Sequence, residues 1–564
     1  MTWLQHYDPL NNVWLSTSVA ALPVVVLLSA IAVFRIRIHL AAALGLAVAL
    51  AVALFAYRMP MQVAFASAAY GAAYGLFPIG WIILNLIFLY QLTVESGRFE
   101  VLRASLATLA PDPRIQVIVI AFCFGAFFEG AAGFGTPVAV TAAILMGLGF
   151  KPLEASALSL IANTAPVAYG SLGTPIIALN AVTGIDLHKL SAMVGRQLPF
   201  FSMIVPFWVV AAMSGLRGVR DVWPAALTAG VAFAIPQFLV SNFHGPWLVD
   251  VIASVCSMGA VALLLLYWKP ATAGRHASDG LQTDPPKLPP RPKGSDVIRA
   301  WMPWIVLSAF LFFWGLPGVK TFLNGERTVI AAGGRTQIEY AMTRIDMPVP
   351  RLHLVVQRTP PVAPADAPPE KAVYSFNWLS ASGTGILFAA VLSGCLMGLT
   401  PQQMLRVYWR TIVRVRFSLL TIMGMLAIGY VTKYSGTDAT LGLALARTGE
   451  WYPFFGTLLG WLGVALTGSD TASNVLFGGL QKITAEQTQL SPVLMCSANS
   501  SGGVMGKMID AQSIVVASTA TNYFGGEGAI LRYVFFHSIA LACLVGVLVY
   551  LQARVEPFMS MVVR

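Results

Sequence analysis

The sequence predicts an all-α polytopic membrane protein, and three observations support this fold class. Hydrophobic residues make up 57% of the 564 residues and charged residues only 10%, whereas a soluble domain has about 25% charged residues. The mean hydropathy is +0.73. Apolar stretches of roughly 20 residues, the length that crosses a bilayer, recur along the whole chain. We therefore expect one large membrane domain rather than several soluble domains.

About 12 apolar stretches are long enough to be transmembrane helices. The stretch 62–93 fits either one tilted helix or a short helix followed by a crossing. The 12 stretches cover residues 17–35, 39–56, 62–93, 155–182, 195–215, 223–242, 248–268, 300–318, 375–397, 417–431, 491–521 and 533–551.

Two further apolar regions, 115–150 and 451–483, carry polar, glycine-bearing interruptions. Glu129 stands among glycines in the first region, and Asp470 follows Gly468 in the second. Hydrocarbon tolerates neither an ionised side chain nor broken backbone unless protein or a water-filled cavity surrounds them. We interpret each region as a re-entrant helical hairpin, with two complete helices as the alternative.

Positively charged loops orient the chain, because Lys and Arg collect on the cytoplasmic side. If the hairpins do not count as crossings, all the clusters fall on one side and both termini lie outside the cytoplasm. This rule also explains the net charge of +11 without nucleic acid. The clusters are Arg35 and Arg37; Arg98, Arg103 and Arg114; Arg217 and Arg220; Lys269, Arg275, Lys287, Arg291, Lys293 and Arg299; and Arg406, Arg410, Arg414 and Arg416.

The two hairpins indicate an inverted-topology repeat. Asn163-Thr164 and Asn499-Ser500 stand 336 residues apart, as do Gly170 and Gly506. By the charge assignment, the first hairpin opens inward and the second outward, which is the arrangement of two repeats related by an axis in the membrane plane. Chance is the alternative, since small residues also mediate ordinary helix packing.

The domain organisation follows from these elements. Segment 319–371 is polar, has strand-like patterning at 336–340 and 352–356, and is expected to be a dispensable appendage outside the cytoplasm. The predicted parts are N-terminal helices 1–60, a first repeat 61–268 with hairpin 115–150, a Pro-rich cytoplasmic linker 269–299, a helix 300–318, the insert 319–371, and a second repeat 375–564 with hairpin 451–483.

Four motifs resemble the L-lactate permease family, and they follow its order along essentially the whole chain except the insert. They are FFEGAAGFGTP at 127–137, ANTAPVAYG at 162–170, TGSDT at 467–471 and SGGVMGKM at 501–508. The resemblance implies a bacterial inner-membrane carrier that imports lactate, and often glycolate, with protons. The run DAQS at 510–513 departs from the family, which has Ser-Pro before the Gln, so the role of Asp510 stays open.

A small 2-hydroxy acid needs positive potential for its carboxylate, a hydrogen-bond partner for its hydroxyl and an apolar wall. Helix N-termini at hairpin tips favour an anion, and glycines let the backbone approach it. For any single hydroxyl, helix capping or packing is the alternative role. The candidate substrate-binding residues are Gly133, Gly135, Thr136, Asn163, Thr164, Thr174, Ser469, Thr471, Ser473, Asn474, Asn499, Ser500, Ser501, Lys507 and Gln512.

Charged residues inside the membrane are the candidates for coupling. Glu129, Asp470 and Asp510 are the acids expected to carry protons, and structural capping of the hairpins is the alternative for the first two. Lys507 is the candidate counter-charge for the substrate carboxylate. It could instead pair with Asp510, three residues on.

Other function classes are less consistent with the sequence. No HExxH or GxSxG motif occurs, and 501–508 lacks the first Gly and the Ser/Thr of a phosphate loop. The five cysteines lie in apolar stretches without a CxxC pair, so we expect no metal, cofactor or enzymatic activity. A channel would need a continuous pore. A sodium-coupled carrier remains the alternative to proton coupling, because broken helices can also bind Na⁺.

Overall fold

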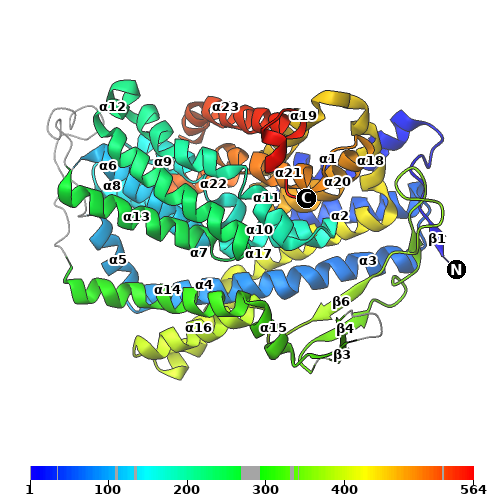
Figure 1. Cartoon of the computed structure of the whole chain (residues 1–564), viewed down its shortest axis with the longest axis horizontal. Coiled ribbons are helices and arrows are strands. Elements are labelled where there is room, and N and C mark those ends of the chain that lie inside the picture. Colours follow the sequence, from blue (N-terminus) through cyan, green and yellow to red (C-terminus); the bar gives the residue numbers. More distant parts are fainter. Residues whose placement is uncertain are drawn as a thin grey trace. The chain divides into compact units, whose positions relative to one another are not determined.

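The computed structural model describes residues 2–32, 34, 36–107, 112–131, 136–268, 292–330, 336–340, 342–523 and 526–564. These residues are mainly helical, which confirms the predicted fold class (Figure 1). They form two compact units, and each is described by itself. Unit 1 comprises Met1–Leu92, Pro303–Gly449 and Val475–Gln489, and unit 2 comprises Thr93–Met302, Glu450–Asn474 and Leu490–Arg564. Most of the predicted linker, residues 269–291, lies outside the described residues.

Unit 1 contains the N-terminal helices and the insert. A π-helical segment, Gly75–Gly80, joins α3 to α4 and is interrupted at Phe77, which agrees with a short helix followed by a second one. Three helices cross the unit boundary, namely α4 near its end, α14 within its first half and α20 after its first turn. The helices are α1 (Val13–Ala32), α2 (Ile38–Ala51), α3 (Met61–Tyr74), α4 (Trp81–Glu95), α14 (Gly294–Gly315), α15 (Pro317–Asn324), α16 (Ser382–Leu396), α17 (Pro401–Ser435), α18 (Thr437–Leu445) and the later turns of α20 (Asp470–Gln487).

Local sequence sets the limits and the packing of α17. Thr400 and Gln403 form a capping box at its start, and Gly436 ends it in the left-handed conformation. Gly71 of α3 and Gly75, at the start of the π-helical segment, face its backbone. A Cβ on Gly71 would contact the Leu426 carbonyl, and one on Gly75 would lie 2.8 Å from Met423 Cα. Small residues four apart thus permit the close helix approach that is common in membranes.

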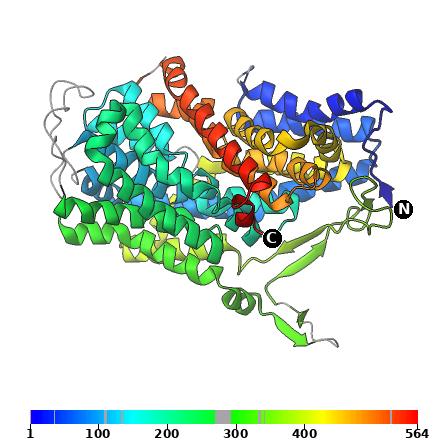
Figure 2. The same cartoon turned by 45° about the horizontal axis from the view of Figure 1, so that its top comes forward.

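The insert is tied to the N-terminus of unit 1. β1 (Trp3–Leu4) pairs in parallel with β5 (Val356–Gln357), and Gln5 Nε2 donates to the carbonyls of Lys433 and Tyr434 at 3.0 and 2.9 Å. Figure 2 shows the green insert reaching the N-terminal strand. The prediction of a strand at 336–340 is confirmed. Of the other predicted strand, 352–356, only Val356 belongs to a strand, β5, because 351–355 is a turn. The other strands are the antiparallel pairs β2 (Arg327–Ile330) with β3 (Thr336–Tyr340) and β4 (Ile345–Pro348) with β6 (Val373–Phe376).

Unit 2 contains both interrupted motifs. Its helices α12 and α13 lie side by side (Figure 1). The helices are α5 (Arg98–Ala107), α6 (Pro113–Gln116), α7 (Gly125–Ala131), α8 (Thr136–Gly147), α9 (Pro152–Ala162), α10 (Gly170–Thr183), α11 (Leu187–Val194), α12 (Leu198–Phe243), α13 (Val249–Tyr267), α19 (Tyr452–Thr467), the first turn of α20, α21 (Pro492–Gly506), α22 (Ala511–Ala520) and α23 (Glu527–Arg554).

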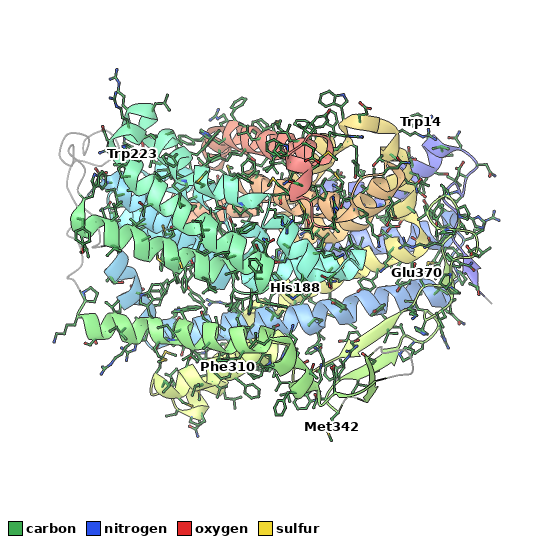
Figure 3. All side chains as sticks on the ribbon, viewed as in Figure 1. Trp14, His188, Trp223, Phe310, Met342 and Glu370 are labelled. Carbon is green, nitrogen blue, oxygen red and sulfur yellow. The ribbon has the colours of Figure 1, made fainter. Side chains whose placement is uncertain are left out.

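The predicted number of spans, 12, stays a prediction. Among the described residues, six helices are long and apolar enough to cross a membrane, or up to eight if each of two bent pairs counts as one span. Helix α12 contains most of the predicted stretches 195–215 and 223–242, and the non-helical residues Gly215 and Val222 form a kink that separates the two. The short helices α5, α11, α15 and α18 lie between the predicted stretches. Exposed Trp14 near the start of α1 points away from the helices of unit 1 (Figure 3), as expected of a tryptophan at a membrane interface.

Two predicted single helices are broken in the structure. In 155–182, α9 and the segment containing α10 meet at a 65° bend. Pro166 and the left-handed conformations of Ser171, Leu172 and Gly173 interrupt the helix there. In 491–521, a 3₁₀ turn (Lys507–Ile509) and the extended backbone of Asp510 separate α21 from α22. Each break follows a predicted hairpin.

Both predicted hairpins consist of two helical arms in contact. In the first, a Cβ on Gly125 would lie 3.3 Å from the Thr141 methyl of the returning arm α8. That arm has 12 residues, about 18 Å of helix against a hydrocarbon core of about 30 Å. In the second, Ser473 Oγ of α20 donates to the Gly460 carbonyl of α19 at 3.2 Å. The short arm favours a re-entrant hairpin over two complete crossings.

Candidate functional site

The first hairpin places Glu129 against the break between α9 and α10. Its side chain is 5% exposed, and Asn163 Nδ2 at the end of α9 donates to Oε2 at 3.1 Å. Gly170 faces the other oxygen, because a Cβ there would lie 2.7 Å from Oε1. The absence of a side chain at position 170 therefore lets the carboxylate approach the broken helix.

The break itself contains strained backbone. Ser171 and Leu172 have φ values of 46° and 57°, which side chains rarely adopt, and Gly173 continues the turn at 77°. Such conformations cost about 1–3 kcal/mol each and concentrate at ligand sites and switch regions. Thr174 Oγ1 closes the turn by donating to the Ser171 carbonyl at 2.6 Å.

The second hairpin places Asp470 in an equivalent position. Its side chain is 2% exposed, and Ser500 Oγ and Asn474 Nδ2 donate to Oδ2 at 2.5 and 3.3 Å. A Cβ on Gly503 of α21 would contact Oδ1. As in the first hairpin, the carboxylate contacts a glycine of the broken helix that follows.

Lys507 lies at the break between α21 and α22, and it is 6% exposed. Its Nζ donates to the carbonyl of Gly468, at the tip of the second hairpin, at 2.6 Å. It also forms an ion pair with Asp510 Oδ2 at 3.3 Å. Asp510 caps α22, since its Oδ1 accepts from the Ser513 N–H at 2.7 Å. Lys507 therefore forms the ion pair with Asp510 that the sequence offered as the alternative to binding the substrate carboxylate.

The predicted amides and hydroxyls connect the two broken elements. Asn474 Nδ2 also donates to the Pro175 carbonyl at 3.2 Å, and Asn499 Nδ2 donates to Asn474 Oδ1 at 2.9 Å. Ser501 Oγ donates to Gln197 Oε1 at 2.6 Å. By contrast, Thr164 Oγ1 donates to the Ile161 carbonyl within its own helix turn. Asn474 and Asn499 thus lie at the junction between the two halves of unit 2.

The remaining predicted residues divide into two groups. Ser469 Oγ accepts from the Ala472 N–H at 3.3 Å, and Thr471 is buried in the first turn of α20. Gly133, Gly135 and the side chains of Thr136 and Gln512 lie outside the part of the chain that the structure describes.

Electrostatic interactions join the charged residues into one group. Lys507 and Asp510 both interact electrostatically with the Glu129 carboxyl, and Lys507 also interacts electrostatically with the Asp470 carboxyl. Sequence reasoning missed a further member, Asp250 in the first turn of α13, which interacts electrostatically with Glu129. A carboxylate at the start of an apolar helix resembles an ordinary N-terminal charge in sequence, so only its burial and its place beside the first hairpin distinguish it.

Known proteins are similar to this chain over nearly its whole length. Residues 16–556 match the family described as L-lactate permease. The glycolate permease GlcA of Escherichia coli (strain K12) is 45% identical, over 98% of this chain and 99% of that protein. The L-lactate permease of Salmonella typhimurium (strain LT2) is 45% identical over 99% of both chains. The L-lactate permease of Bacillus subtilis (strain 168) is 43% identical, over 99% of this chain and 100% of that protein.

One solved structure also aligns, the crystal structure of the Alcanivorax borkumensis YdaH transporter, which has an unusual topology. It is 13% identical, the alignment covers 86% of both chains, and the TM-score is 0.42.

Proposed function

Because the chain belongs to the L-lactate permease family, we propose that it imports lactate, and glycolate or related 2-hydroxy monocarboxylates, by proton symport. Membership of a permease family confirms the prediction of a multi-pass inner-membrane transporter rather than an enzyme. The observation that carries the proposal is the buried charge group of unit 2, which joins both hairpins to both broken helices.

The second half offers the features that a small carboxylate needs. Lys507 supplies positive charge, and the first turns of α20 and α22 supply helix N-termini, which favour anions. Ser500 and Asn474 stand beside them with hydroxyl and amide groups for the 2-hydroxyl. The apolar side chains of the hairpins supply a wall for a methyl group. We assign the carboxylate to this half of the site.

The balance of charges favours proton coupling. Beyond the Asp112–Arg114 pair, the buried charged residues described in unit 2 are four carboxyls and one amine, namely Glu129, Asp250, Asp470, Asp510 and Lys507. With every group ionised, this site would repel an anion. Each carboxyl that takes up a proton removes one negative charge, so protonation and anion binding support each other. This is the thermodynamic requirement for symport.

Alternating access follows in this proposal from two opposed hairpins in inverted repeats, spanning 61–268 and 375–564. The contacts at the chain ends are consistent with both termini outside the cytoplasm. β1 pairs with the insert, and Arg196 donates to the carbonyl of Met561 at 3.0 Å. Each terminus therefore lies beside a segment that the loop charges also assign to the outside.

Uptake of labelled lactate and glycolate into liposomes containing the purified protein tests this proposal. An inward proton gradient without sodium should drive accumulation of both acids, and each should compete with the other. A sodium gradient alone should drive none. Accumulation that requires sodium would replace proton coupling with the sodium-coupled alternative, and absence of uptake under either gradient would contradict the substrate assignment.

A further inference from the structure

Asp250 is a buried carboxylate that takes no part in the hydrogen bonds described for the site. It is 1% exposed, and neither of its oxygens has a hydrogen-bond partner among the described residues. Its position in the first turn of α13 gives it the favourable potential of the helix N-terminus. An ionised carboxylate in such surroundings costs several kcal/mol, and a protonated one avoids that cost.

The fold holds Asp250 against both parts of the first repeat's site. A Cβ on Gly130, next to Glu129, would lie 2.8 Å from Asp250 Cβ. A Cβ on Gly173, in the left-handed turn, would lie 2.5 Å from Pro246 Cβ, four residues earlier. Residues 246–250 therefore pack on both the first hairpin and the break between α9 and α10. A movement of either element would change the surroundings of Asp250.

The neighbouring carboxyl groups of Glu129 and Asp250 have different surroundings. Asn163 donates a hydrogen bond to Glu129, which favours its ionised form, whereas none of the residues that the structure describes donates one to Asp250. Like charges in electrostatic contact oppose double ionisation. We propose that Asp250 is a second proton-binding residue, which holds a proton while Glu129 is ionised. Binding forms one O–H bond on the carboxyl with a proton from water, and release reverses it.

The elements around Asp250 contribute few other ionisable groups. Glu129 of α7 and Tyr169 of the turn before α10 interact with it electrostatically. Cys123 lies in the π-helical arm that packs on α13, in contact with Ser257 at 3.2 Å. His188 of α11, labelled in Figure 3, and His244 contact the ring of Trp247, three residues before Asp250. None of these contacts provides a cation paired with Asp250 among the described residues.

Infrared difference spectra of the purified full-length protein test the proposal, which rests on the proposed proton symport. At neutral pH the wild type should show the carbonyl stretch of a protonated carboxylic acid. Asp250→Asn should remove that band, and Asp250→Glu should shift it. Glu129→Gln should retain it, as should Glu556→Gln, which changes an exposed carboxylate.

Transport supplies the second readout. Asp250→Asn should lower lactate accumulation under a proton gradient by about tenfold or more, and Asp250→Glu should restore part of it. A wild type without the protonated band, or an Asp250→Asn variant with normal accumulation and an unchanged band, would overturn the assignment. These results differ from failure of the proposed function itself, in which wild-type uptake does not respond to protons at all.

Discussion

The two hairpins hold their carboxylates in the same manner. Glu129 and Asp470 each accept a hydrogen bond from the broken helix that follows, from Asn163 and Ser500, at 3.1 and 2.5 Å. Each also contacts a glycine of that helix, Gly170 or Gly503. These partners belong to the segments whose spacing suggested an internal repeat, but they are not at matched positions, since 336 residues on from Asn163 and Gly170 stand Asn499 and Gly506.

The difference between the halves lies in the additional charge. The second half has Lys507, paired with Asp510 and bound to the hairpin tip. The first half has Asp250, a further carboxylate with no partner among the described residues. Similar backbone frameworks thus carry different charged groups, with a cation present in the second half alone among the buried residues described in unit 2 beyond the Asp112–Arg114 pair. A site with a cation suits the substrate anion, whereas a site with excess carboxylate suits a proton.

Removing the cation of the second half should have the largest effect. Lys507→Met leaves the buried Asp510 without its ion-pair partner and deprives an anion of its counter-charge. Loss of a charged partner costs a few kcal/mol, so lactate affinity should fall by about a hundredfold, and Lys507→Arg should retain part of it. Lactate binding by purified protein, measured by calorimetry, checks both variants.

The double variant Lys507→Met/Asp510→Asn separates the two roles of Lys507. Both buried charges disappear together, so folding should recover. If Lys507 binds the substrate carboxylate, affinity stays low in the double variant. Restored lactate affinity would show that Lys507 serves only Asp510.

Adding a methyl group at the two glycines that contact Glu129 and Asp470 should have an intermediate effect. Gly170→Ala and Gly503→Ala would push a Cβ against Glu129 and Asp470. Overpacking typically costs about 1–3 kcal/mol, so uptake should fall roughly tenfold in each. Gly147→Ala is the matched control, because a Cβ there meets nothing within 4 Å. Equal uptake rates in all three variants would show that the contacts of Gly170 and Gly503 with the carboxylates do not affect transport.

Changes in the insert should have the smallest effect, with a distinction within it. Replacing the β2–β3 hairpin, residues 327–340, by a short Gly/Ser linker should leave KM within about twofold, as for other peripheral changes. Replacing all of 319–371 also removes β5, which pairs with β1, and the Arg358–Glu370 ion pair at 3.0 Å. The larger replacement should lower the melting temperature while KM stays similar. A large rise of KM in the shorter variant would show that the outer strands contribute to transport.

The sequence predicted the membrane class, both interrupted regions and the family, because buried charge and glycine within apolar runs leave few structural alternatives. It did not predict that 155–182 and 491–521 are broken, since Ser171, Leu172 and Asp510 carry no signal of left-handed or extended backbone. Their conformations depend on packing against the hairpins. Asp250 was missed for a similar reason, because burial of a helix-terminal acid is a property of tertiary structure.

The domain boundaries and the individual roles of the site residues stay predictions. Glu129 has the central role among them, because the account makes this carboxylate the group that couples protons to the substrate through the first hairpin.

Glu129→Gln in liposomes tests that central claim most directly, with lactate accumulation under a proton gradient and lactate exchange at equal pH measured in the same preparation. The account predicts that accumulation is abolished while exchange continues, since glutamine keeps the shape and the Asn163 neighbour but cannot carry the proton. Normal accumulation by Glu129→Gln under a proton gradient would contradict it.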